Sequence, residues 1–198
     1  MHLPNTRLLG LAAALLALAT GRAEAQYQRY GFVAAGYAKA QDSYYEPGFN
    51  LAAGYLARFG PPVGAYVGVR TPIAWTRVTP DEDAVADSLG VPAGEVEGGS
   101  ATVVESGIEL VAGYETDVLG GYFWYGIHYL SETRNEITLG SQTIPQRNRS
   151  GLGPSYGAGV LFRVSPRVAV FTEWYRSGGF DDAMLRMEGL RAGITGQF

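Results

Sequence analysis

The chain has 198 residues and a net charge of −4 at pH 7, and it contains no cysteine, so disulfide bonds and cysteine-ligated metal sites are excluded. Its positive charges are almost all arginine, with Lys39 the single lysine, and they form no basic stripe, which argues against nucleic acid as a partner. The 28 glycines and 13 tyrosines favour short strands and tight turns over helices.

The first 25 residues have the layout of a secretory signal peptide. Arg7 precedes an apolar run, Leu8–Ala19, and the small-residue motif A-E-A at Ala23–Ala25 follows it. A membrane-spanning helix needs about 20 apolar residues, so this run is too short to be an anchor. We therefore predict that residues 1–25 are cleaved and that residues 26–198 form a single mature domain.

Strand-like alternation fills the rest of the chain. In Val63–Trp75, for example, every second residue is apolar or Thr, while the opposite parity carries Arg70 and glycines. The first segment, about Tyr30–Ala38, is apolar on both parities, and we assign Tyr30, Phe32 and Ala34 to the apolar face. Seven segments show the clear pattern: Phe49–Ala57, Val63–Trp75, Thr102–Tyr114, Phe123–Tyr129, Pro154–Phe162, Val168–Trp174 and Leu190–Phe198.

Alternation alone also fits a soluble sandwich or a lipocalin-like barrel with an apolar interior. Two further features favour a membrane barrel with a polar lumen. Connections alternate between short turns and long polar loops, as in outer-membrane barrels, where both termini lie on the short-turn side. Large aromatic residues stand at strand ends, where interfacial girdles occur: Tyr55, Trp75, Tyr114, Phe123, Tyr129, Phe162, Trp174 and Phe198.

These features predict an all-β fold, an eight-stranded antiparallel up-and-down transmembrane β-barrel. A sheet in lipid must close on itself, so we expect the last strand to pair with the first and Phe198 to lie at the barrel rim. Side chains fill the interior of a barrel of eight strands, which argues against a wide pore.

The charges on the inward parity predict a lumen charge network. Its expected members are Arg70, Glu105, Glu109, Glu173 and Arg191. A symmetric closing hairpin would place Glu173 opposite Arg191, and Arg70 could pair with Glu105 or Glu109. Opposite charges in a narrow lumen are expected to pair because an unpartnered buried charge is costly.

Catalytic and metal-binding motifs are weak. His128 is the one histidine after the signal peptide, and Ser131, three residues on, would lie on the opposite strand face, which does not suit a nucleophile–base pair. We therefore predict a lumen histidine, no metal site, no catalytic residue and no cofactor. The segment Thr79–Gly99 carries six acids and no basic residue, and we predict a solvated, mobile loop there.

The chain resembles the small OmpA/OmpX-like outer-membrane β-barrel family. The stretches that carry the resemblance are "GFVAAGYAKA", "SPRVAVFTEWYRS" and the ending "RAGITGQF". It implies the bacterial outer membrane as location, with outer-membrane lipids, lipopolysaccharide and the outer-membrane assembly machinery as partners of a monomer. It further implies a terminal membrane-insertion signal that includes Arg191, Gly193 and Phe198.

The expected function is a structural or surface-interaction role through external loops, with an extracellular partner that the sequence does not identify. Lipid A-modifying enzymes also occur on this fold, so the alternative is an outer-membrane enzyme that modifies lipid or lipid A.

Overall fold

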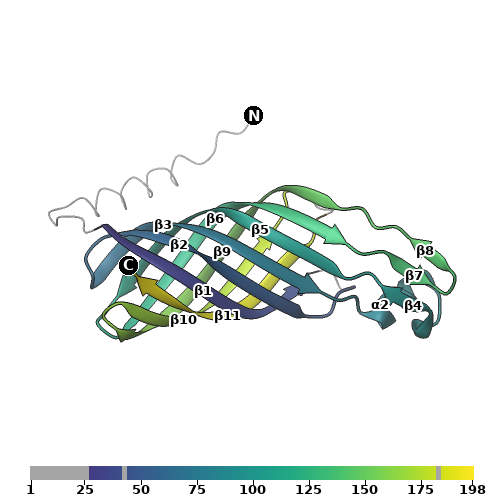
Figure 1. Cartoon of the computed structure of the whole chain (residues 1–198), viewed down its shortest axis with the longest axis horizontal. Helices are drawn as coiled ribbons and strands as arrows, with labels where there is room; N and C mark the ends of the chain where they lie inside the picture. Colours follow the sequence, from purple (N-terminus) through teal and green to yellow (C-terminus); the bar gives the residue numbers. More distant parts are fainter. Residues whose placement is uncertain (1–26, 42–43, 182–183) are drawn as a thin grey trace.

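The computed structural model describes residues 27–41, 44–181 and 184–198, so the predicted signal peptide lies outside the described residues. Within these ranges, eight long strands close an all-antiparallel barrel in the order β1-β11-β10-β9-β6-β5-β3-β2 (Figure 1). Each strand pairs with its neighbour in the chain, and β11 closes against β1. The barrel strands are β1 (Tyr27–Ala40), β2 (Gly48–Phe59), β3 (Gly64–Val78), β5 (Ala101–Glu115), β6 (Leu119–Arg134), β9 (Arg149–Ser165), β10 (Val168–Gly178) and β11 (Arg186–Gln197).

The outer surface carries the apolar parity of seven strands, as predicted. Ile108 is 62% exposed, whereas its neighbour Glu109 is fully buried inside the barrel. A soluble protein has the opposite arrangement, with apolar side chains inside and charged side chains outside. The arrangement seen here suits a barrel whose outer wall faces lipid. Exposed aromatic side chains stand toward both ends of the strands, among them Tyr27, Tyr37, Phe49, Tyr55, Trp75, Tyr114, Phe123, Tyr129, Phe162 and Phe198.

The facing predicted for β1 is wrong. Phe32 and Ala34 are buried in the lumen, and Val33 and Tyr37 face outward. Phe32 packs edge-to-face on Phe171, with 6.2 Å between ring centroids. The lumen therefore contains aromatic as well as charged side chains. A large apolar side chain such as Phe32 does not by itself identify the lipid-facing side of a strand.

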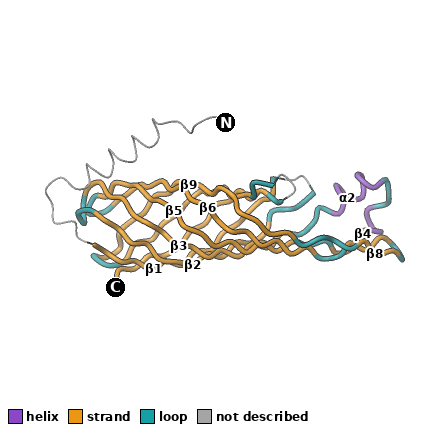
Figure 2. Tube along the Cα trace, turned by 90° about the horizontal axis from the view of Figure 1, so that it is seen from above, coloured by secondary structure: helices purple, strands orange, loops and turns teal. Residues whose placement is uncertain are grey.

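The two ends of the barrel differ in the length of their connections. Two to four residues join the strands at one end, where the described chain also begins and ends (Figure 1). The opposite end carries the long loops and extends into a separate structure beyond the barrel (Figure 2). In outer-membrane barrels the short turns are periplasmic and the long loops extracellular.

The extension, here called the lobe, consists of residues 79–100 and 135–148. It contains helix α2 (Glu82–Leu89), the 3₁₀ turn η1 (Ala93–Glu95) and a sheet of strands β4 (Val96–Gly98), β7 (Ile137–Leu139) and β8 (Gln142–Ile144). The Asp81 side chain caps α2 by accepting a hydrogen bond from the Ala84 amide at 3.1 Å. Its core contains buried Val85, Ala86 and Val96, with Val91, Ile137 and Leu139 packed against them.

The prediction of a mobile acidic loop is therefore wrong. Counting only the charges of residues 79–99 overlooked three valines and an N-cap, which together let the segment fold against residues 135–148. No helix among the described residues has the length and hydropathy that a membrane crossing requires.

Candidate functional site

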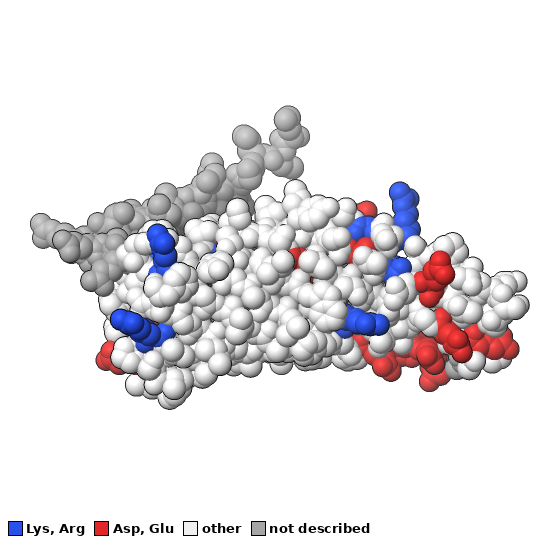
Figure 3. Space-filling model, in the orientation of Figure 1, with Lys and Arg blue, Asp and Glu red and all other residues white. Residues whose placement is uncertain are grey.

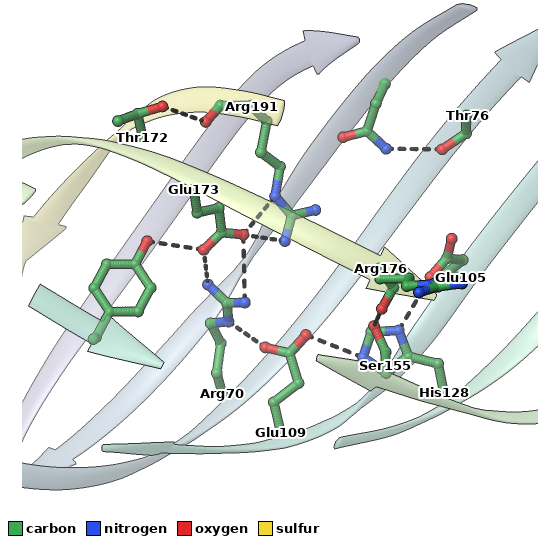
Figure 4. A network of polar contacts seen from close by, with 12 residues as sticks. Arg70, Thr76, Glu105, Glu109, His128, Ser155, Thr172, Glu173, Arg176 and Arg191 are labelled. Atoms are coloured by element: carbon green, nitrogen blue, oxygen red, sulfur yellow. Dashed lines mark hydrogen bonds and ion pairs between the residues drawn. The ribbon is translucent and has the colours of Figure 1, made fainter. Parts of the chain in front are cut away.

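Ionised side chains from five strands meet in the middle of the lumen (Figure 4). Arg70 on β3, Glu109 and Glu105 on β5, His128 on β6, Glu173 on β10 and Arg191 on β11 are each at most 4% exposed. Strand alternation puts them there, because each lies on the inward parity of its strand. We call these six residues the luminal network.

Glu173 is the most heavily bonded member of the network. Its Oε2 accepts from Arg70 Nη1 at 2.9 Å and from the Tyr122 hydroxyl at 2.8 Å. Its Oε1 accepts from Arg191 Nε at 2.6 Å and also from Arg70 Nη2 at 3.5 Å. One carboxylate thus joins two guanidiniums from strands that are not neighbours in the sheet, since β1 and β2 lie between β3 and β11.

A second chain of contacts runs from Arg70 toward the extracellular end. Glu109 accepts from Arg70 Nε, and its other oxygen lies 3.0 Å from His128 Nε2. The second ring nitrogen, Nδ1, lies 3.2 Å from Glu105, which also accepts from the Ser177 hydroxyl at 2.8 Å.

The position of His128 between two carboxylates has a simple electrostatic consequence. A carboxylate oxygen accepts hydrogen bonds, so both ring nitrogens can donate only when the imidazole is protonated. With a protonated His128, the three positive and three negative charges of the luminal network balance. Such balance is what allows six ionised groups to share a buried space.

Glycine and aromatic residues make the space that the network occupies. A Cβ at Gly107 would lie 2.2 Å from His128 Cδ2, and one at Gly126 would lie 2.8 Å from Glu109 Cγ. Trp124 stacks on His128 with 6.2 Å between ring centroids, and the Arg70 guanidinium lies 4.6 Å from the centroid of the Trp124 ring. The network is therefore closely packed against the backbone at Gly107 and Gly126 and against the Trp124 ring.

The structure pairs Glu173 with Arg191 in the register that a symmetric hairpin predicts. Of the two partners considered for Arg70, Glu109 is its direct neighbour across β3 and β5. Glu105 does not touch Arg70 and joins the network through His128 instead. Ion pairing between β3 and β10 was not predicted. Alternation shows which side chains point into the lumen, but it does not show which of them meet across it.

Three further contributors were missed. Tyr122 and Ser177 share the inward parity with charged neighbours, so alternation would have indicated both. The third is a cluster at the short-turn end, where Glu115 pairs with Arg58 at 2.6 Å and with Arg163. Alternation also marks these residues, but they lie at strand ends, where the sequence alone does not separate lumen from turn.

The network offers no catalytic arrangement. Both nitrogens of His128 are engaged by carboxylates, so it has no free position from which to activate a nucleophile. The described residues hold no cluster of three or more histidine, cysteine or carboxylate side chains with metal-binding geometry.

Of the predicted insertion signal, Arg191 and Gly193 lie on β11, and Phe198 directly follows the strand. Arg191 belongs to the luminal network, and Gly193 lies where a Cβ would approach Val33 O at 2.2 Å. Phe198 is 71% exposed at the short-turn rim, its amide donates to Arg29 O at 3.2 Å, and its ring packs edge-to-face on Tyr55. Whether these residues direct insertion stays a prediction.

The extracellular end is strongly polarised. The acidic side chains gather at the far end of the molecule, on the lobe, while basic side chains lie where the lobe meets the barrel and at the opposite end (Figure 3). The exposed acids of the lobe are Glu82, Asp83, Asp87, Glu95, Glu97 and Glu136. Against them, the lobe carries Arg147 as its one basic residue, counted over residues 79–100 and 135–148.

Comparison with solved structures matches this architecture. A major outer-membrane protein of Thermus thermophilus aligns with a TM-score of 0.54 at 13% identity, over 86% of this chain and 99% of that one. The chain has the fold of the small outer-membrane β-barrels.

Two further barrels support this assignment. Neisserial surface protein A aligns with a TM-score of 0.51 at 12% identity, over 87% of this chain and 97% of that one. Ail, the attachment invasion locus protein of Yersinia pestis, gives 0.51 at 16%, over 89% and 100%. No family model and no curated protein sequence matches the chain. Together with the apolar outer wall, this outer-membrane barrel fold indicates the bacterial outer membrane as its location.

Proposed function

We propose that the protein is a closed outer-membrane anchor that binds partners at the cell surface through its lobe. The observation that carries this proposal is the lobe itself, a folded and acidic structure that projects beyond the barrel (Figure 2). A hydrophobic core and a capped helix hold its charges in fixed positions, which lowers the entropy that a partner must overcome on binding.

The sign of the charge defines the partner. Exposed carboxylates on α2, η1, β4 and at Glu136 give the lobe a negative field that attracts cationic surfaces and repels polyanions. We therefore propose a partner with a basic surface, such as a cationic protein or peptide.

Lipopolysaccharide is a second proposed contact, and it would bind at the extracellular ends of the barrel strands rather than at the lobe. Lys39, Arg77 and Arg186 are exposed near the extracellular ends of β1, β3 and β11, between the outer wall and the lobe. Cationic side chains at this height suit the phosphate groups of the outer leaflet. The alternative, an enzyme that modifies lipid, has no arrangement around His128 in its favour.

A binding measurement tests the proposed role of the lobe. Protein in nanodiscs is passed over surfaces coated with poly-L-lysine or with heparin, and we expect retention on poly-L-lysine alone. The lobe variant Asp83→Asn/Asp87→Asn should bind about threefold or more weakly, because exposed ion pairs each contribute about 0.2–1 kcal/mol. The matched control is Glu46→Gln/Asp117→Asn, which removes two exposed acids outside the lobe.

Equal binding of both double variants would show that the lobe is not the binding surface. Conductance in planar bilayers tests the closed anchor separately. The packed luminal network predicts no stable channel, and a persistent open conductance would contradict the proposal of a closed barrel.

A further inference from the structure

The short-turn end of the barrel exposes two arginines, Arg29 on β1 and Arg167 in the turn between β9 and β10. Basic side chains stand out at this end of the molecule in Figure 3. The described residues provide no hydrogen-bond or ion-pair partner for either guanidinium, and Arg29 Cζ lies 5.1 Å from the centroid of the Tyr27 ring. Both positive charges are therefore available to a partner from outside the chain.

The acids at the same end do not neutralise these two charges. This end is formed by residues 27–31, 56–66, 112–122, 161–170 and 195–198. Its two acids are Glu115 and Asp117. Glu115 is buried and already paired with Arg58 and Arg163, and Asp117 is exposed in the turn between β5 and β6, where it pairs with neither exposed arginine. Four arginines against two acids leave this end with a net positive charge.

The two exposed arginines lie on either side of the last residues of β11. Arg29 O accepts a hydrogen bond from the Phe198 amide at 3.2 Å, and Arg167 O accepts one from the Gln197 amide at 2.8 Å. Neighbouring strands lie about 4.8 Å apart, so the two arginine backbones are separated by about 10 Å. Two extended arginine side chains can span this distance and contact the same headgroup.

Aromatic side chains place Arg29 at the height of the membrane interface. The Tyr27 ring also packs on Phe59, with 5.4 Å between ring centroids, and Phe198 packs on Tyr55 at 6.1 Å. All four rings are at least 38% exposed. Exposed aromatic rings gather where lipid headgroups meet the hydrocarbon region. Arg29 therefore lies at headgroup level, at the end that is periplasmic in outer-membrane barrels.

We propose that Arg29 and Arg167 bind the headgroup of an anionic phospholipid in the periplasmic leaflet of the membrane. The headgroup phosphate accepts hydrogen bonds from both guanidiniums, whose planar forks suit phosphate oxygens. The acyl chains run along the outer wall past Val33 and Ile194, which are paired across β1 and β11 and are 60% and 53% exposed.

Charge decides which phospholipid the site prefers. A zwitterionic lipid carries an ammonium group beside its phosphate, and this group offsets the attraction between phosphate and arginine. An anionic headgroup with a neutral glycerol moiety lacks that ammonium, so each nearby arginine strengthens its binding. The site lies at the end opposite to the lobe and to the exposed cations Lys39 and Arg77, so its failure would leave the proposed surface function untouched.

Native mass spectrometry of the detergent-solubilised protein tests this preference. Dioleoyl-phosphatidylglycerol is the probe, and dioleoyl-phosphatidylcholine, with identical acyl chains, is the comparison lipid. We expect phosphatidylglycerol to bind about fivefold more tightly, since each exposed arginine makes a modest electrostatic contribution. In Arg29→Gln/Arg167→Gln, the two lipids should bind equally.

Arg77→Gln/Arg147→Gln is the matched control, because it removes the same charge from two exposed residues on the extracellular half of the molecule. This variant should keep the preference for phosphatidylglycerol. Gel mobility of unheated samples establishes that each variant is folded.

Cross-linking to the unmodified protein locates the bound lipid and needs no variant. A phosphatidylglycerol with a photoreactive diazirine on its headgroup is activated in nanodiscs, and the labelled peptides are identified by mass spectrometry. We expect labels next to Arg29 and Arg167, with competition by unlabelled phosphatidylglycerol and not by phosphatidylcholine. Equal binding of the two lipids to the unmodified protein, the same loss of preference in both double variants, or labels confined to the extracellular end would overturn the proposal.

Discussion

Arg70 on β3 donates to Glu173 on β10 across the lumen, with 2.9 Å between Nη1 and Oε2, although 103 residues separate them in the sequence. This contact links two walls of the barrel that share no backbone hydrogen bonds. It therefore ties the first half of the sheet to the last hairpin through side chains alone.

The Arg70–Glu173 contact predicts strong coupling in a double-mutant cycle. Arg70→Met or Glu173→Gln alone leaves a buried partner uncompensated and should reduce the free energy of unfolding by about 3–5 kcal/mol. The double variant should lose clearly less than the sum, because removing one positive and one negative charge together keeps the charges of the luminal network balanced. Urea unfolding in detergent, followed by tryptophan fluorescence, measures the four stabilities.

Glu97→Gln combined with Arg70→Met provides the control for this cycle. Glu97 is exposed on the lobe, far from the network, so its effect should simply add. Additive effects for Arg70 and Glu173 as well would mean that the charges are hydrated independently rather than paired.

Adding a side chain at Gly107 is expected to cause a steric clash inside the lumen. A Cβ there would meet Ile127 O at 2.4 Å and His128 Cδ2 at 2.2 Å, so Gly107→Ala must displace the imidazole from its two carboxylates. We expect a loss of about 1–3 kcal/mol in the free energy of unfolding, measured by urea titration. Gly121→Ala on β6 is the matched control, because the nearest atom to its Cβ would be 3.9 Å away. Similar stabilities for both variants would contradict the close packing described around His128.

We predict that Phe198 contributes to assembly of the barrel beyond its packing contact with Tyr55. If the terminal aromatic is part of the insertion signal, Phe198→Ala should lower the folded yield in the outer membrane, scored by the mobility of unheated samples. Tyr55→Ala removes the same ring contact but leaves the terminus intact. An equal loss in both variants would assign the effect to the Tyr55–Phe198 contact, and unchanged yield in Phe198→Ala would remove support for the signal.

The N-cap formed by Asp81 is expected to stabilise the lobe. Asp81→Ala removes the N-cap of α2 and should destabilise the lobe by about 0.5–2 kcal/mol while leaving the barrel unaffected. Hydrogen exchange of the α2 amides measures this change. Asp83→Ala is the control, since it removes an acid from the first turn without removing the cap. Faster exchange of equal size in both variants would point to the helix dipole rather than to capping.

Alternation carried most of the prediction of the fold. It gave the strand count, the short and long connections and the outward face of seven strands, because a period of two is enforced wherever lipid meets one side of a sheet. It failed at β1, where Phe32 is large and apolar yet faces inward. Both faces of β1 are apolar, since its inner face packs on the ring of Phe171, so composition could not distinguish them.

The sequence predicted most residues of the candidate site, but it predicted fewer of the contacts between them. Arg70, Glu109, Glu173 and Arg191 were named from their parity, and the Glu173–Arg191 pair followed from hairpin geometry. The Arg70–Glu173 contact depends on how strands on opposite walls approach, which barrel closure and strand tilt determine and which no local pattern records. The lobe was missed because its fold needs two loops that lie on different hairpins.

The lobe is built from segments that leave and re-enter the barrel on the adjacent strands β3, β5, β6 and β9. Its sequence can therefore change, or be exchanged as a unit, without altering the register of the strands that cross the membrane. We expect sequence variation between related barrels to concentrate there, because a change in the lobe leaves the pairing of the barrel strands intact.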